Sequence, residues 1–148
     1  MVYKQILLLV FCFVIALIDY KKYIIPDFLL ILLSGIFIVL DLFNDPKIIL
    51  NRLIVAVIVL LLLLLIYKIM GGLGFGDVKY FTVLAYCYGF PMICFVGLIA
   101  CAAGILFFLI KAYVFKNKLE KIPFAPFICF ACTLVFILGF IFPEYFIL

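Results

Sequence analysis

Six apolar segments separated by short breaks make up most of this chain of 148 residues. A helix needs about 20 predominantly apolar residues to cross the roughly 30 Å of hydrocarbon in a bilayer. Because 73% of the residues are hydrophobic and only 12% are charged, the chain lacks the polar surface that a water-soluble domain requires. The sequence therefore predicts an all-α, polytopic membrane protein with about six transmembrane helices in one bundle, over residues 6–18, 28–40, 53–67, 78–90, 92–110 and 124–142.

The breaks between these segments are too short for a separate soluble domain. Residues 1–148 are therefore expected to form a single integral-membrane domain. The first segment has no small-residue cleavage site after it, so it is expected to remain as a membrane span. The composition also argues against a disordered chain, a collagen-like repeat and a nucleic-acid-binding protein.

Lysine and arginine residues are distributed unevenly between the two ends of the six predicted spans. One end carries three of them, Lys4, Lys47 and Arg52. Cytoplasmic loops of membrane proteins carry an excess of these residues, so the richer end is predicted to be cytoplasmic and both termini external. The net charge of +4 thus indicates orientation rather than a polyanionic partner. The richer end carries eight: Lys21, Lys22, Lys68, Lys79, Lys111, Lys116, Lys118 and Lys121.

The chain contains six cysteines but no histidine. Without histidine, Ser-His-Asp catalysis and histidine-based zinc motifs are excluded. Cys129 and Cys132 form a C-x-x-C pair, but apolar residues flank it and no second pair lies outside the predicted spans. Cysteine in such runs behaves as a small hydrophobic residue. Neither a metal site nor a disulfide framework is therefore predicted, and carboxylates remain as the natural catalytic groups.

Two acidic residues lie at the predicted cytoplasmic ends of spans. Asp19 ends the first span, and Asp77 opens the fourth directly after two glycines, Gly74 and Gly76. A carboxylate at membrane depth is costly, which makes each acid a candidate functional residue. The alternatives are that each acid forms an ion pair with a lysine close in sequence (Lys22 or Lys79), or that Asp77 caps its helix.

Two carboxyl groups in one site favour aspartyl hydrolysis. They do not both ionise readily, so the pair retains one proton. The ionised group then deprotonates a water, and the protonated group donates to the carbonyl oxygen of the scissile bond. Gly74 and Gly76 are expected to let a substrate strand approach the backbone closely.

The fourth apolar segment is short for a membrane span. Its 13 residues make about 20 Å of helix, which is less than the hydrocarbon thickness. Non-helical backbone is tolerated at depth only where protein or trapped water satisfies it. The glycine-rich stretch before the segment is therefore expected to dip into the membrane and place Asp77 at a wet cavity.

Three segments of the chain resemble the motifs of one family. Gly74-Phe75-Gly76-Asp77-Val78-Lys79 resembles the GxGD signature of the type IV prepilin peptidases and preflagellin peptidases. Asp19 followed by Ile25-Pro26-Asp27 resembles the other active-site segment of these enzymes. The stretch KIPFAPF at 121–127 is similar to a third conserved stretch. The three segments occur in family order and together span essentially the whole chain.

This resemblance implies a membrane aspartyl endopeptidase of the cytoplasmic membrane. Its expected substrates are prepilin-like precursors, from which it removes a short basic leader on the cytoplasmic side. Carried over by position, the catalytic pair is Asp19 and Asp77, acting with water and with no metal or organic cofactor. Long family members add a domain with zinc-binding cysteines linked to N-methylation, whereas this chain resembles the compact forms, so methyltransferase activity is not expected.

Four further motif residues are expected to support the site or to bind substrate. Asp27 either tunes the catalytic pair, contacts the leader or caps the second helix. Lys79 either holds a substrate carboxylate, steadies Asp77 or is an interfacial lysine whose ammonium group reaches the water. Pro123 and Pro126 are expected to shape the start of the last span, with a possible second role in a substrate groove.

Other functions remain open from the sequence. A presenilin-like intramembrane protease also uses GxGD, but such enzymes are longer and hold both aspartates in mid-membrane. A small proton- or cation-coupled transporter or channel subunit would use the same acids for ion binding. The absence of an obvious two-fold internal repeat argues mildly against transport. A structural assembly protein is the remaining alternative.

Overall fold

The computed structural model of the chain describes residues 2–70, 74–115 and 123–141. These residues form six helices and no strand, which confirms the prediction of an all-α membrane fold. Helices α1, α2, α3 and α5 contain stretches long and apolar enough to cross a bilayer. The helices are α1 (Val2–Lys22), α2 (Asp27–Asn44), α3 (Lys47–Met70), α4 (Phe75–Tyr88), α5 (Met92–Phe115) and α6 (Ala125–Ile141).

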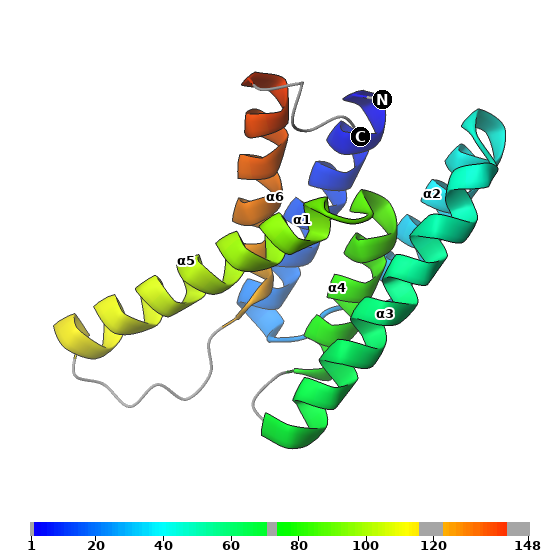
Figure 1. Cartoon of the computed structure of the whole chain (residues 1–148). Coiled ribbons are helices and arrows are strands. Elements are labelled where there is room, and N and C mark those ends of the chain that lie inside the picture. The colour runs from blue at the N-terminus through cyan, green and yellow to red at the C-terminus, as the bar shows by residue number, and fades with distance from the viewer. Residues whose placement is uncertain (1, 71–73, 116–122, 142–148) are drawn as a thin grey trace.

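Successive helices run in opposite directions, so that alternate connections lie at opposite ends of the bundle (Figure 1). The start of α1, the α2–α3 and α4–α5 turns and the end of α6 point one way, and the α1–α2 loop and the start of α4 point the other. Helix α1 packs against α6 and α2, while α4 packs mainly against α3 and α2. This arrangement brings the end of α1 close to the start of α4.

Helix α4 is short but central. It has 14 residues, which correspond to about 21 Å of helix. Beyond its first turn, which carries Asp77, most of α4 is buried. Because protein surrounds it, its length need not match the hydrocarbon thickness. Its buried residues are Val78, Tyr80, Phe81, Leu84, Ala85, Tyr86, Cys87 and Tyr88.

The outer surface of the bundle is strongly apolar. Among the described side chains of helix α3 only that of Ala56 is buried, and leucines and isoleucines are exposed along the helix. In α5, six consecutive residues from Ile105 to Ile110 are all exposed, and this part of the helix leans away from the bundle (Figure 1). Such a surface suits a bilayer rather than water. Residues 71–73 of the glycine-rich stretch at 71–74 and residues 116–121 of the basic run at 111–121 lie outside the described residues.

Candidate active site

Asp19 and Asp77 lie 58 positions apart in the sequence, and the structure brings them to one cavity. This cavity, of about 320 Å³, lies between the end of α1, the α1–α2 loop and the start of α4. Antiparallel packing produces the meeting, because the last turn of α1 and the first turn of α4 share one end of the bundle. The cavity is lined by Asp19, Tyr23, Ile24, Ile25, Asp27, Gly74, Phe75, Gly76, Asp77 and Lys79.

The carboxylate of Asp19 is held by the beginning of α6. Asp19 is only 5% exposed, and its Oδ2 accepts a hydrogen bond of 3.1 Å from the backbone N–H of Ala125. Ala125 is the first residue of α6, where N–H groups have no partner within the helix and the helix dipole favours a negative charge. Among the described residues Asp19 forms no ion pair, so the alternative that it pairs with Lys22 is wrong and the backbone of Ala125 supplies its donor.

Asp77 lies in the first turn of α4, folded back over Gly74. The Asp77 N–H donates to the Gly74 carbonyl at 3.0 Å. A Cβ atom at Gly74 would lie 2.8 Å from the Asp77 carboxylate oxygen Oδ2, which is closer than real Cβ contacts allow. Gly74 has φ −72° and ψ 136°, which any residue can adopt. Its lack of a side chain therefore serves the carboxylate, not the backbone conformation.

The environment of Asp77 favours its protonated form. Burial, and secondly the negative charge of Asp19, raise the pKa of Asp77 to about 6, while a hydrogen bond with the backbone of Gly74 acts in the opposite direction. This carboxyl group therefore retains its proton to a higher pH than an exposed aspartate. Burial disfavours the charged form of both acids. At Asp19 backbone donors of Phe124 and Ala125 oppose this effect, whereas at Asp77 the neighbouring charge of Asp19 adds to it.

The loop after α1 closes one side of the cavity. Tyr23 has φ 54°, in the left-handed region that is uncommon for a residue with a side chain. This turn directs Ile25 onto α4, where a Cβ at Gly76 would lie 3.3 Å from the Cβ of Ile25. Gly76 therefore allows close packing of the loop on the helix. Both glycines are thus required by contacts within the chain. Their expected role in the close approach of a substrate strand stays a prediction.

Asp27 and Lys79 form an ion pair at the rim of the cavity. The Lys79 Nζ donates to Asp27 Oδ2 at 2.7 Å and lies 5.0 Å from the centre of the Phe75 ring. Both side chains are partly exposed, so the pair adds little to stability. The alternative that Lys79 pairs with Asp77 is wrong, because Lys79 links the start of α4 to the start of α2.

Pro123 and Pro126 do not line this cavity. Pro126 lies instead on a surface groove between α1 and α6, together with Phe13, Tyr20 and Phe130. Pro126 is the second residue of α6, so its role in shaping the start of that helix agrees with its position. Lys121, at the head of the same motif, lies outside the described residues.

Sequence reasoning missed the backbone donor of Ala125. The signal was available only in part: prolines at the start of an apolar segment mark a helix N-terminus, where free N–H groups accumulate. Nothing in the sequence says that this N-terminus faces Asp19, which is 106 positions away. The turn at Tyr23 was also missed. Tyrosine rarely adopts a positive φ, so its presence in the sequence does not indicate such a turn.

Comparison with known proteins gives one match. The model of the type IV leader peptidase family matches residues 6–109. The matched region contains both Asp19 and Asp77 and ends before α6. Comparison with curated proteins and with solved structures gives no match.

The protonation of Asp77 is testable without an activity assay. A membrane-permeant carbodiimide, which modifies protonated carboxyl groups, is expected to label Asp77 below pH 6, and labelling is expected to fall as the pH rises through about 6. Asp19→Asn removes the neighbouring charge, so the midpoint is expected to move to lower pH. The measurement is mass spectrometry of the digested protein. A midpoint near the ordinary value of 3.8 in the unmodified protein would contradict the prediction.

Proposed function

Because the chain belongs to the type IV leader peptidase family, we propose that it is an aspartic endopeptidase that removes the leader of prepilin-like precursors. The observation that carries this proposal is the shared cavity of Asp19 and Asp77. Both acids lie near helix ends, Asp19 in the last turn of α1 and Asp77 in the first turn of α4. That position suits cleavage at the membrane edge better than cleavage in mid-membrane.

The different surroundings of the two acids support separate roles. We assign Asp19 as the general base, because the Ala125 N–H and the N-terminus of α6 stabilise a negative charge on it. We assign Asp77 as the general acid, because its raised pKa of about 6 favours the proton-bearing form. A carboxyl pair with unequal environments is the arrangement that lets one group accept a proton while the other donates one.

The reaction then follows from these roles. Asp19 takes a proton from a water between the two carboxyl groups, and the resulting hydroxide forms a bond to the carbonyl carbon of the scissile peptide. Asp77 donates its proton to the carbonyl oxygen, which gives a neutral tetrahedral diol. When the C–N bond breaks, the proton on Asp19 passes to the leaving amine and a diol proton returns to Asp77. Atoms and charges balance, and the pair is restored.

The substrate is proposed to reach the pair from the cytoplasm. Lys21 and Lys68 lie at the same end of the bundle as the cavity, which supports a cytoplasmic location for this end. Since the leader is basic, an acidic group at the entrance is favourable. Asp27 is that group, because its side chain is 58% exposed at the rim even while it pairs with Lys79.

The first test of this function is the removal of each acid. Asp19→Asn and Asp77→Asn are each expected to lower cleavage of a co-expressed precursor by on the order of 100- to 10,000-fold, the usual contribution of general acid–base catalysis. Asp45→Asn, at the opposite end of the bundle, is the matched control and is expected to cleave normally. Gel shift of the precursor measures processing, and membrane fractionation confirms insertion. Normal cleavage by either cavity variant would refute the assignment.

The backbone donor to Asp19 is testable with a substitution that removes one N–H group. Ala125→Pro deletes this donor at the first position of a helix, where proline is favoured. Because a hydrogen bond to a charged group contributes about 1.5–3 kcal/mol, cleavage is expected to fall roughly 10- to 100-fold. Cleavage requires the ionised form of Asp19, and this form has lost its hydrogen-bond donor in the variant. The pH below which cleavage declines is therefore expected to be higher than in the unmodified protein.

Ala125→Gly keeps the N–H group and serves as the control. It is expected to leave the pH profile of cleavage unchanged, whatever it does to the stability of the helix. Equal profiles for the proline and glycine variants would show that the backbone donor has no part in the reaction.

The contact between Gly74 and Asp77 gives a third test. Gly74→Ala places a methyl group 2.8 Å from the Asp77 carboxylate oxygen, so the carboxyl group must move. A displacement of about 1 Å in a catalytic group can cost on the order of 100-fold in rate, and a loss of this size is expected. Gly35→Ala is the matched control, since nothing lies within 4 Å of the added atom. It is expected to cleave normally, and similar activity of the two variants would contradict the role of Gly74.

A further inference from the structure

A second buried carboxylate lies at the opposite end of the bundle. Asp41 of α2 is 2% exposed. It accepts hydrogen bonds from Lys4 Nζ at 2.6 Å, Arg52 Nη1 at 2.8 Å and Tyr86 Oη at 3.2 Å. These partners come from α1, α3 and α4, so the cluster joins four helices. The sequence prediction did not single out any member of this cluster as a site.

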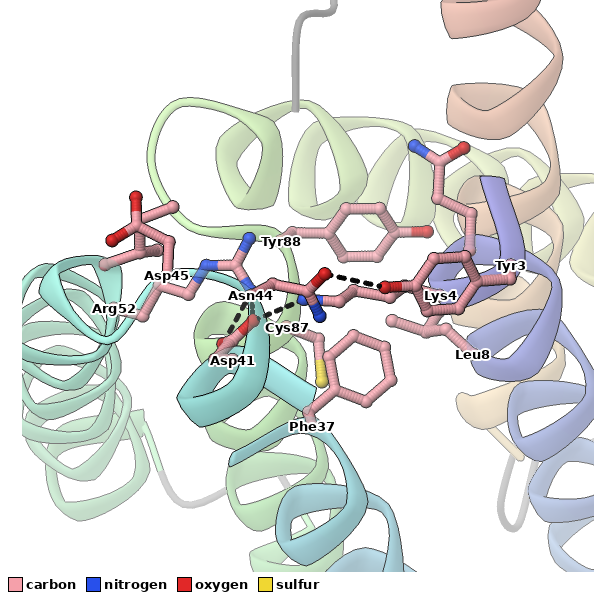
Figure 2. Close-up of a pocket in the computed structure, with 12 residues that line it drawn as sticks. Tyr3, Lys4, Leu8, Phe37, Asp41, Asn44, Asp45, Arg52, Cys87 and Tyr88 are labelled. Atoms are coloured by element: carbon pink, nitrogen blue, oxygen red, sulfur yellow. Dashed lines mark hydrogen bonds and ion pairs between the residues drawn. The ribbon is translucent and has the colours of Figure 1, made fainter. Parts of the chain in front are cut away.

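The two cations of the cluster retain unused hydrogen-bond donors. Figure 2 shows Lys4 and Arg52 reaching Asp41 from opposite sides. Only Nη1 of the Arg52 guanidinium bonds to Asp41, and in the described part of the chain its other two nitrogens have no protein acceptor. Lys4 likewise uses one of its donors. Their side chains are 14% and 13% exposed, and both line a cavity, so these donors are accessible to a ligand there. Donors in such surroundings favour a further acceptor.

A cavity of about 310 Å³ lies against this cluster. Its wall is partly charged and partly apolar, as Lys4 and Arg52 are joined there by Leu8, Phe37 and Tyr88. Asp45 also lines the cavity, and its carboxylate oxygen accepts the backbone N–H of Lys47. The two cations and two carboxylates balance, so the cavity suits a ligand that brings a phosphate together with apolar groups rather than a highly charged anion. We call it the outer cavity.

The position of the outer cavity indicates where such a ligand comes from. Lys4 precedes Asp19 by 15 positions in α1, which is about 22 Å along the helix. The two polar sites therefore lie near opposite ends of the bundle. A bundle that crosses a bilayer would hold the outer cavity near the lipid headgroups, on the side away from Asp19 and Asp77. At that level a phosphate group and the start of an acyl chain are present together.

We propose that the outer cavity binds the headgroup of a membrane phospholipid. Lys4 and the free face of the Arg52 guanidinium donate to the phosphate oxygens, since guanidinium and ammonium groups are the usual partners of phosphate. Tyr3 and Ile48, the more accessible apolar residues of the lining, pack against the glycerol and the first acyl carbons. Asp45 at the margin is compatible with a headgroup that also carries an amine. This ligand-binding site is separate from the peptidase cavity and does not depend on it.

Lipid binding by the purified, delipidated full chain tests this proposal. Phosphatidylethanolamine is titrated in detergent, and retained lipid is counted by native mass spectrometry. Lys4→Gln is expected to weaken binding about tenfold, while Asp41 keeps its bonds to Arg52 and Tyr86 and the protein keeps its fold. Lys47→Gln, an exposed lysine at the same end, is the matched control and is expected to bind as the unmodified protein does. Equal binding by Lys4→Gln and the unmodified protein would overturn the proposal.

Two further probes separate the sources of the ligand chemistry. Diacylglycerol, which lacks the phosphate, is expected to bind without any dependence on Lys4, and Lys4-dependent binding of it would refute phosphate recognition. Inorganic phosphate at millimolar concentration is expected not to displace the lipid, and displacement would identify a free-anion site instead. Gln5→Trp fills the cavity wall without changing its charge. It is expected to reduce lipid binding, and full binding in this variant would place the lipid elsewhere.

Discussion

Compensation of carboxylates inside an apolar bundle is the constraint on which this structure depends. An uncompensated charge in a low-dielectric interior is costly, so each acid requires a specific partner or retains its proton. Asp41 is surrounded by two cations and a tyrosine hydroxyl. Asp19 is held by one backbone donor. Asp77 has a backbone hydrogen bond with Gly74, but burial and the charge of Asp19 outweigh it and raise the pKa of Asp77 to about 6. The same physical cost thus gives an ion-paired acid at one end of the bundle and the proposed catalytic pair at the other.

Helix α4 connects these two polar ends. Its first turn holds Asp77 and its last turn carries Tyr86, which donates to Asp41. Because α4 is central, its position depends on packing against α2 and α3 rather than on contact with lipid. The 14 residues of α4 are enough to hold Asp77 beside the end of α1 and Tyr86 beside Asp41.

The fold was largely predictable because hydrophobicity alone determines it. The apolar segment at 78–90 corresponds to α4 within a few residues, and the other five segments agree similarly with their helices. The convergence of Asp19 and Asp77 also follows from six alternating spans. Partner choice was not predictable: Lys79 is two residues from Asp77 but bonds to Asp27, which is 52 positions away. Such choices depend on helix rotation and spacing, which hydrophobicity does not specify. Asp41 was missed for the same reason.

The contribution of α6 illustrates why a site can extend beyond its recognisable sequence. The match to the leader peptidase family ends at residue 109, yet the donor to Asp19 comes from Ala125. A backbone N–H is supplied by every residue except proline, so sequence leaves almost no trace of its role. The hydrogen bond to Asp19 depends on where α6 begins and not on which side chain residue 125 carries. Packing of α6 against α1 fixes that position. On this view the last helix acts on the proposed catalytic pair through its backbone geometry, and its side chains serve mainly to hold it in place.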